Sequence, residues 1–238
     1  MRFMLPILLL LSACSGGDRN VNVREALRDS ARSSSTIIFT EPQPVDSSDV
    51  VYYPLLFQRK EIGVGLSSSY EGERSVYWNL LFVNTSTGAR HLLSEDRKII
   101  IWQVHSGSGV SGSYQGSNSK ILAGKRWILY DVFANDYNGD GMPDAKDPAS
   151  LFVSDREGYG FRQVSPEGWG VVSWRVAERS GKLLLLARRD DNGDRRIDDG
   201  DKSVPFLVDL DAGGAARQLF QEDYIDTLHG SLRRIWKQ

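Results

Sequence analysis

From Val50 onward, short runs of β-branched, aliphatic and aromatic residues alternate with clusters of Gly, Ser, Asn and Asp. Short apolar runs bounded by turn-forming residues are typical of β-strands. Because no long amphipathic helical pattern stands out in this part, the pattern predicts an all-β fold. The predicted strands are Val50–Leu56, Val76–Asn84, Lys98–Val104, Trp127–Phe133, Ser150–Ser154, Val171–Val176, Lys182–Ala187 and Pro205–Asp209.

Three segments of this part resemble one another. Each reads as an apolar strand, a polar turn with Gly, and a short strand that carries Arg with His or Gln, which is typical of a hairpin whose turn needs a positive φ. In the second and third segments a further strand and an Asp-rich loop come first, and both features keep one spacing. The pattern therefore predicts an internal repeat. The segments are 80–94, 150–165 and 204–219.

The spacing of the last two segments is constant. Phe152 and Phe206 are 54 positions apart, and so are Asp136 and Asp190 in the preceding loops. The first segment matches more loosely, with Phe82 placed opposite Phe152. Chance alternation of apolar and polar residues does not hold two features in register.

The outline resembles the blades of TolB-like and WD-type β-propellers, on Leu183–Ala187, residues 206–210, Gly213 and residues 217–219. The resemblance covers about residues 50–238. It implies a β-propeller-like stack of small antiparallel sheets, in which neighbouring blades supply each other's core.

With Tyr224–Trp236 counted as a further unit, about four blades are expected. A closed small propeller, an open stack of sheets and an incomplete ring completed by another chain all remain open. A strand near Ile235 and Trp236 that pairs with Thr36–Thr40 would close the ring.

The N-terminus has the pattern of a secretory signal. Arg2 precedes an apolar run over residues 3–11, which is shorter than the roughly 20 residues that span a bilayer. The residues before Cys14, Leu-Ser-Ala, resemble the bacterial lipobox, in which the cysteine is lipidated and becomes the new N-terminus. Cys14 is the single cysteine of the chain. This resemblance implies a lipid anchor in the membrane, and Ser15 directly after Cys14 favours the outer membrane.

The expected domain organisation follows from these boundaries. Residues 1–13 form the lipoprotein signal peptide, and residues 14–48 carry the lipidated cysteine and a flexible tether rich in Ser, Asp, Arg and Asn. A short helix over residues 22–32 is the alternative for part of the tether. Residues 49–238 form the propeller-like domain.

Two Asp-rich loops carry the clearest chemistry, at residues 136–147 and 190–201. Both place oxygen-bearing side chains at loop positions 1, 3, 5, 9 and 12, as the calcium loop of an EF-hand does, because Ca²⁺ prefers six to eight oxygen ligands. The predicted ligands are Asp136, Asn138, Asp140, Asp144, Asp147 and the carbonyl of Met142 in the first loop, and Asp190, Asn192, Asp194, Asp198, Asp201 and the carbonyl of Arg196 in the second.

The two loops depart from the EF-hand pattern in three ways. Position 12 is Asp and not Glu, the flanking segments read as strands, and Arg195 occupies position 6, where the turn favours Gly. The loops therefore resemble dockerin-type and other extracellular calcium loops inserted between strands. The alternative is a solvated acidic turn, because Asp, Asn and Gly are ordinary turn residues.

Other function classes lack support in the sequence. A formal net charge of −2 without a long basic run argues against nucleic acid as a partner. Catalytic elbows, zinc-protease motifs and phosphate loops are missing, and the histidines (His91, His105, His229) have no ligand spacing.

The sequence thus favours a non-enzymatic, calcium-binding lipoprotein of the cell envelope that binds a protein or an envelope polymer. The alternatives are a glycan-directed envelope hydrolase with a site between blades, and a subunit whose ring a partner completes.

Overall fold

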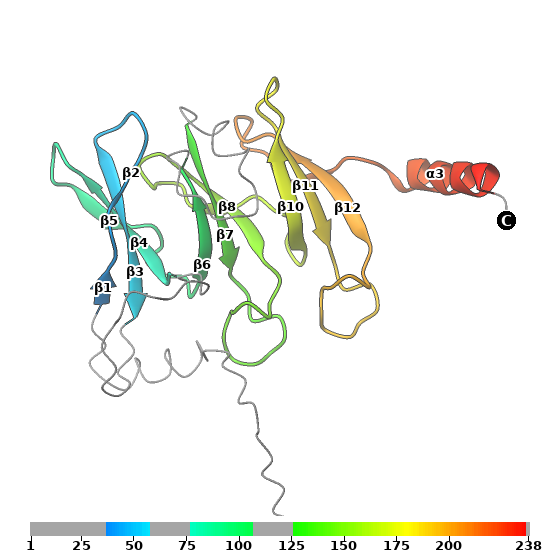
Figure 1. Ribbon diagram of the computed structural model, residues 1–238, viewed down its shortest axis with the longest axis horizontal. Helices are drawn as coiled ribbons and strands as arrows, with labels where there is room; N and C mark the ends of the chain where they lie inside the picture. Colours follow the sequence, from blue (N-terminus) through cyan, green and yellow to red (C-terminus); the bar gives the residue numbers. More distant parts are fainter. Residues whose placement is uncertain (1–36, 58–76, 107–125, 237–238) are drawn as a thin grey trace, which may run out of the picture.

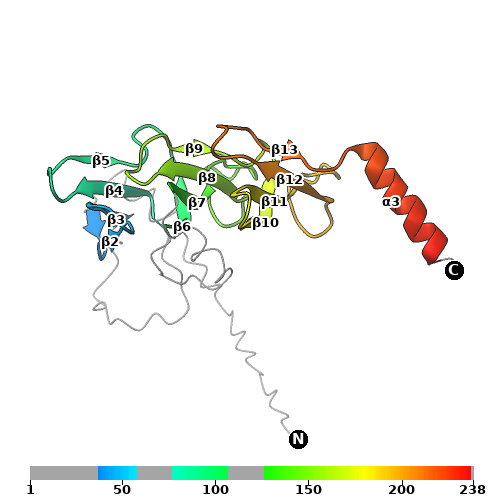
Figure 2. The same cartoon turned by 90° about the horizontal axis from the view of Figure 1, so that it is seen from above.

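The computed structural model describes residues 37–57, 77–106 and 126–236. These residues form three antiparallel sheets, here called A, B and C in chain order, and the helix α3. The sheets stand side by side in an open row, with α3 beyond sheet C (Figures 1 and 2). Cys14 and the predicted tether up to residue 36 lie outside the described residues.

Sheet A has the strand order β1-β3-β4-β5, and β2 pairs with the other part of β3. All of these pairings are antiparallel. The strands of sheet A are β1 (Ile37–Phe39), β2 (Gln43–Pro44), β3 (Val50–Phe57), β4 (Asn79–Asn84) and β5 (Arg90–Leu92).

Sheets B and C are four-stranded meanders, in which each strand pairs with the next along the chain. Sheet B consists of β6 (Ile100–His105), β7 (Trp127–Phe133), β8 (Ser150–Asp155) and β9 (Arg162–Gln163). Sheet C consists of β10 (Gly170–Val176), β11 (Leu183–Arg188), β12 (Ser203–Val208) and β13 (Arg217–Gln218).

The core lies between the sheets. One cluster, with Tyr52 and Phe82 from sheet A and Tyr130 from sheet B, fills the space between A and B. A second cluster, with Leu151 from sheet B and Trp174 from sheet C, fills the space between B and C. Successive strand residues point to opposite faces, so sheet B is buried on both. Each large side chain buried here stabilises the fold by roughly 1.5–3 kcal/mol.

Sheets B and C follow one plan. The pairing of their first two strands shifts register at the same point, between Ile101 and Gln103 in sheet B and between Val171 and Ser173 in sheet C. Their middle strands also match, because the pair Tyr130–Phe152 in sheet B corresponds to Leu185–Phe206 in sheet C. All four side chains are buried and face the preceding sheet.

Sheet A fits this plan with a different register from the one the sequence suggested. Phe82 points toward sheet B, whereas Phe152 points from sheet B toward sheet A. Side chains alternate along a strand, and a slip of one residue reverses every one of them. The counterpart of Phe152 is therefore Leu81, which pairs with Leu92 eleven positions later, as Phe152 pairs with Gln163.

The prediction of a β-rich fold is confirmed in its coarse form, because each of the eight predicted strands has a counterpart in the structure. The prediction of a fourth, strand-bearing unit at Tyr224–Trp236 is wrong, since this segment is the helix α3 (Glu222–Ile235). The predicted pairing of its end with Thr36–Thr40 is wrong as well, because β1 pairs with β3. Residues 37–44, assigned to the tether, contribute two strands to sheet A.

The helix α3 has clear local causes. Tyr224, Leu228 and Leu232 recur at a spacing of four, the spacing of one helical face. Acidic residues occupy the first turn and basic residues the last, which complements the helix dipole. No residue of α3 is buried, so packing contributes little to its stability. None of the helices that the described residues contain has the length and apolar character needed to cross a membrane.

Candidate metal centre

The two Asp-rich loops occupy equivalent places in their sheets. The first, residues 136–147, connects β7 to β8, and the second, residues 190–201, connects β11 to β12. Both project from the same edge of their sheets, as neighbouring rings at the bottom of Figure 1. The expectation that strands and not helices flank these loops is confirmed.

In the first loop, side-chain oxygens accept hydrogen bonds from backbone N–H groups of the same loop. The Asp136 carboxylate accepts hydrogen bonds from the backbone N–H groups of Asp140 (2.8 Å) and Gly141 (2.5 Å), and Asn138 Oδ1 accepts one from Asp140 (2.8 Å). Asp144 Oδ1 accepts the N–H of Lys146 at 2.8 Å. These four bonds between side chains and the backbone curl the loop tightly.

Asp147, at position 12, closes the ring. Its Oδ1 accepts the N–H groups of Tyr137 (2.9 Å) and Asn138 (3.1 Å), and its Oδ2 accepts that of Asp144 (2.8 Å). The residue is 5% exposed. Burial raises the pKa of Asp147, although the three hydrogen bonds oppose that shift.

The second loop repeats these contacts with different residues. Asp190 accepts the N–H groups of Gly193 (2.5 Å) and Arg195 (2.9 Å), and Asn192 Oδ1 accepts that of Asp194 (2.8 Å). The N–H of Gly200 donates to Asp198 Oδ1 at 2.8 Å.

Asp201, at position 12 of the second loop, is 6% exposed and closes its ring in the same way. Its Oδ1 accepts the N–H of Asp191 (3.0 Å) and its Oδ2 that of Asp198 (2.9 Å). The position-12 aspartates are thus the buried carboxylates of both loops, and each ties the start of its loop to the end.

The backbone conformation matches as well. Position 4 has a positive φ in both loops, 72° at Gly139 and 77° at Gly193. Position 6 is Gly141 at 102° in the first loop and Arg195 at 64° in the second. Arg195 therefore adopts the left-handed conformation that glycine accommodates more easily. The sequence identified this position as unfavourable for arginine, and the structure shows that the loop keeps its shape in spite of that cost.

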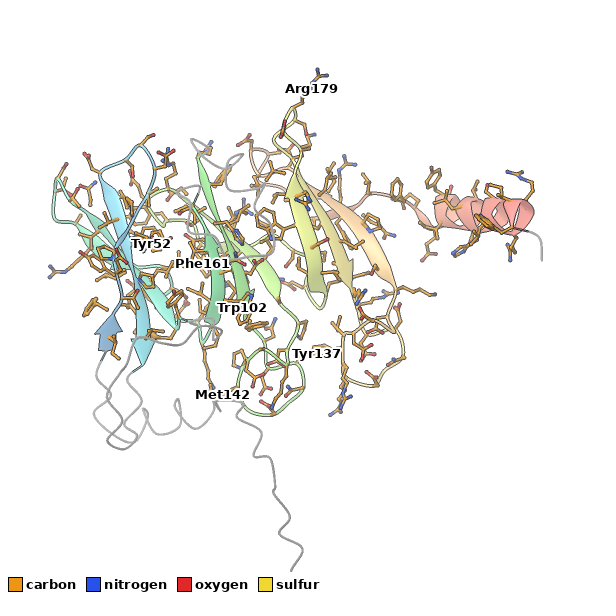
Figure 3. All side chains as sticks on the ribbon, in the orientation of Figure 1. Tyr52, Trp102, Tyr137, Met142, Phe161 and Arg179 are labelled. Carbon is orange, nitrogen blue, oxygen red and sulfur yellow. The ribbon has the colours of Figure 1, made fainter. Side chains whose placement is uncertain are left out.

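Tyr137 joins the two loops. Its hydroxyl donates a hydrogen bond to Asp190 Oδ2 at 3.3 Å, and the side chain lies between the loops in Figure 3. Desolvation of Asp190 acts to raise its pKa, but hydrogen bonds from Arg195 N–H, Gly193 N–H and Tyr137 outweigh it and lower the pKa. Desolvation and the nearby Asp190 charge raise the pKa of Tyr137. No local pattern predicts this contact, because it depends on how sheets B and C stack.

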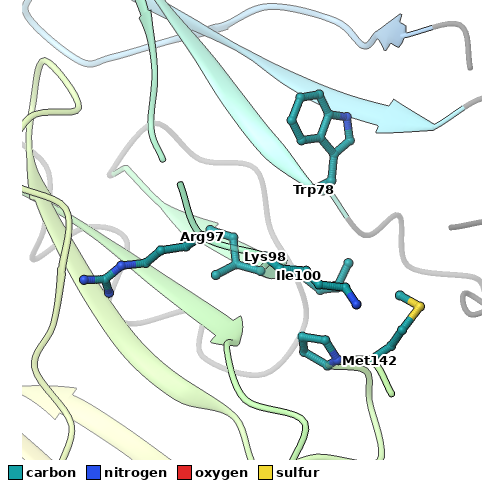
Figure 4. Close-up of a pocket in the computed structure, with 7 residues that line it drawn as sticks. Trp78, Arg97, Lys98, Ile100 and Met142 are labelled. Atoms are coloured by element: carbon teal, nitrogen blue, oxygen red, sulfur yellow. The ribbon is translucent and has the colours of Figure 1, made fainter. Parts of the chain in front are cut away.

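The first loop is also fastened to the body of the protein. Lys98 Nζ donates a hydrogen bond to the Gly141 carbonyl at 3.1 Å. The Met142 side chain is buried beside a pocket of about 100 Å³, whose lining includes Trp78, Lys98 and Ile100 (Figure 4). Position 7 of this loop thus combines a backbone carbonyl, the predicted ligand, with a side chain anchored in an apolar pocket.

Within the described ranges, no group of three or more His, Cys, Asp or Glu side chains is gathered as a metal cluster. Carboxylates at the proposed ligand positions, such as those of Asp136, Asp147, Asp190 and Asp201, accept instead N–H groups of their own loop. A carboxylate has about four lone-pair sites, so the one to three hydrogen bonds that each of these carboxylates accepts leave acceptor capacity. These bonds also fix the side chains in place. The loops therefore retain oxygen donors that could serve a hard cation.

A second polar cluster lies between sheets B and C. His105 Nε2 lies 2.9 Å from Asp131 Oδ2, and the Trp174 indole N–H donates to Asp131 Oδ1 at 3.1 Å. The rings of His105 and Trp174 meet edge to face, with centroids 4.7 Å apart. Sequence analysis missed this cluster, because its members come from three strands and only the stacking of two sheets brings them together.

No protein-family model matches the chain, and no curated protein matches it significantly.

Proposed function

We propose that this chain is a calcium-binding lipoprotein of the bacterial cell envelope with a non-enzymatic binding or scaffold role. A lipid on Cys14 would attach it to the membrane, preferably the outer membrane. Two Ca²⁺ ions would bind at the ends of sheets B and C. The partner surface would belong to the stacked sheets and their loops, as a fold analogy suggests.

The observation that carries the calcium proposal is the agreement between the two loops. They differ in sequence at several positions, yet they share their ring-closing hydrogen bonds and the positive φ at positions 4 and 6. An ordinary acidic turn has no reason to impose a left-handed conformation on Arg195, which costs roughly 1–2 kcal/mol. A common function of the two loops, the placement of oxygens around an ion, accounts for that cost.

The ligands follow from the loop positions. Ca²⁺ takes six to eight oxygens at about 2.3–2.6 Å, and alternate residues of such a ring aim theirs inward. In the first loop they would be Asp136, Asn138, Asp140, Asp144, Asp147 and the carbonyl of Met142. In the second they would be Asp190, Asn192, Asp194, Asp198, Asp201 and the carbonyl of Arg196.

Charge supplies a second argument. Each loop concentrates four carboxylates at the proposed ligand positions, and like charges held together destabilise a loop unless a cation lies among them. Extracellular modules bind Ca²⁺ with dissociation constants of about 10⁻⁴–10⁻³ M. At a concentration tenfold above its dissociation constant, each ion would stabilise the folded chain by about 1.4 kcal/mol.

The stacked sheets support a propeller-like role. Sheets B and C are four-stranded antiparallel meanders that bury apolar faces against a neighbouring sheet, as blades do. We therefore propose that the row is a segment of a propeller-like arrangement. The hydrolase alternative would need a pair of carboxylates, whereas the described cluster of His105, Asp131 and Trp174 holds one.

A calcium titration of residues 15–238 by calorimetry tests the metal proposal, together with thermal melting with and without chelator. We expect two sites, the first lost in Asp140→Ala and the second in Asp194→Ala. Asp199→Ala is the matched control: this carboxylate lies in the second loop, at position 10, where it is almost fully exposed and pairs with Arg188. It removes the same charge without removing a ligand, so both sites should persist.

Absence of heat and of any melting shift up to several millimolar Ca²⁺ would reduce the loops to acidic turns. Equal loss in Asp194→Ala and Asp199→Ala would show that the loop attracts cations only through its net charge. The lipid anchor is tested separately, by palmitate labelling of the full chain in a Gram-negative host. Labelling should disappear in Cys14→Ser.

A further inference from the structure

The two ends of the row of sheets carry apolar faces with no neighbour among the described residues. Sheet B shows what such faces do when a neighbour is present. Its middle strands bury one set of side chains against sheet A and the other set against sheet C. The set that faces sheet C is Leu129, Leu151 and Val153, all fully buried.

Sheet C repeats that face on its outer side. The cross-strand pair Leu129–Val153 of sheet B corresponds to Leu184–Leu207 of sheet C, one strand position beyond the matched core pairs. Leu184 alternates with the buried Leu183 and Leu185, so it points away from sheet B.

The outer face of sheet C is apolar and open. Leu184 is 40% exposed and Val172 is 44% exposed, and three partly exposed side chains surround them. A helix follows directly in the chain, but α3 buries none of its residues on this face or elsewhere. The apolar side chains of this outer face, here called the C face, are Val172, Leu184, Leu186, Pro205 and Leu207.

The outer face of sheet A, at the other end of the row, is also apolar. Tyr53 and Leu81 pair across its middle strands as Tyr130 and Phe152 do in sheet B, where that pair is buried against the preceding sheet. In sheet A the corresponding side has no preceding sheet among residues 37–57, 77–106 and 126–236. Phe39, 57% exposed, packs edge to face on Tyr53 at 6.2 Å between ring centroids. The apolar side chains of this outer face, here called the A face, are Phe39, Val51, Tyr53, Leu81 and Val83.

We propose that the C face of one copy packs on the A face of a second copy of this chain. The interface would continue the two sheet-on-sheet interfaces already present within the chain, because each face has a buried counterpart in sheet B. Three sheets from each copy make six, within the range of about four to eight for closed propellers. Two copies would thus close a ring with two equal contacts. This inference is independent of calcium and of the lipid.

Light scattering coupled to gel filtration of residues 15–238 tests the proposal. We expect the mass of two chains at micromolar concentration, and the mass of one chain for Leu184→Asp and for Leu81→Asp, which lie at opposite ends of the row. Leu228→Asp is the matched control on α3, where the side chain is similarly exposed at 45%; it should leave the pair intact. Circular dichroism of each variant shows whether the sheets are retained.

Cross-linking distinguishes whether a second copy or α3 covers the C face. Residues 15–238 contain no cysteine, so introduced cysteines react alone. A mixture of Leu184→Cys chains with Leu81→Cys chains should give a covalent dimer with a short bismaleimide. A single-chain mass for the unmodified protein would overturn the proposal. In a double variant that carries both Leu184→Cys and Leu228→Cys, cross-linking within one chain would overturn it as well, since α3 would then cover the C face.

Discussion

Replacement of Gly158 by Ala tests the packing of sheet A on sheet B, on which the stacked arrangement depends. Gly158 lies in the turn between β8 and β9 at φ 89°, and a Cβ atom there would lie 2.6 Å from the Phe82 ring. Gly160, two residues on, has φ 68°, but a Cβ there would meet no heavy atom within 4 Å. The two glycines therefore separate backbone strain from side-chain contact.

The expected magnitudes follow from these two terms. A left-handed conformation costs a non-glycine residue roughly 1–2 kcal/mol, and this applies to both variants. An extra carbon in a filled core costs about 1–3 kcal/mol more, and this applies to Gly158→Ala alone. The Phe82 ring cannot retreat easily, because it is buried between Tyr52 and His91, each with its ring centroid 5.7 Å away.

We therefore expect Gly158→Ala to lower the free energy of unfolding by about 2–5 kcal/mol and Gly160→Ala by about 1–2 kcal/mol. Urea unfolding followed by tryptophan fluorescence measures both, with the midpoints compared at constant slope. Replacement of Gly by Ala also lowers the conformational entropy of the unfolded chain. This stabilising contribution is the same for both variants and cancels in the difference between them. Equal destabilisation by the two variants would refute the close contact between the β8–β9 turn and sheet A.

Three further predictions concern single residues of sheets B and C and their loops. Asp131→Ala should lower the free energy of unfolding by about 2–4 kcal/mol in urea, because it removes the carboxylate to which the buried Trp174 indole N–H and the His105 ring are bonded. Arg195→Gly should relieve a left-handed strain of roughly 1–2 kcal/mol and raise the calcium affinity of the second loop by about five- to thirtyfold, whereas the neighbouring Arg196→Gly, which removes the same charge, should not. The pKa of Asp209 is lowered, first by a backbone N–H and then by a lysine ammonium. The stabilisation from its carboxylate is therefore present above the ordinary carboxyl pKa and is lost as the pH falls through the lowered value. On acidification, the melting temperature of Asp209→Asn should fall less than that of the unmodified protein.

The strands were predictable because their signal is local. Alternating apolar runs between Gly-rich and Asp-rich turns fix where a strand begins and ends, and Trp127–Phe133 matches its prediction at both ends. The short second strands of the hairpins, such as Arg162–Gln163, followed from the repeat. The register of sheet A did not follow. Apolar residues at Leu80, Leu81 and Phe82 fit either face, so only packing against sheet B decides which side chain is buried.

The helix α3 was missed although the sequence contained its signal. Tyr224, Leu228 and Leu232 have a helical spacing, with acidic residues before them and basic residues after. The expected repeat led us to assign this segment to another sheet. His105 and Asp131 are a different case. They lie 26 positions apart, and their contact depends on the pairing of β6 with β7, which no local pattern encodes.

The loops and the core are energetically separable, and this constrains what calcium can do. The two apolar clusters lie between the sheets and contain no residue of either loop. Loss of Ca²⁺ should therefore leave the sheets folded and loosen residues 136–147 and 190–201. The loops would then be held by their N–H bonds and, in the first loop, by Lys98 and the buried Met142 side chain. Limited proteolysis in chelator should cut within these loops while the far-UV circular dichroism persists. Because Tyr137 links the loops through Asp190, Tyr137→Phe should let each loop become protease-sensitive at its own calcium concentration. Loss of the sheets in chelator would contradict this separation, since calcium would then hold the core and not only the loops.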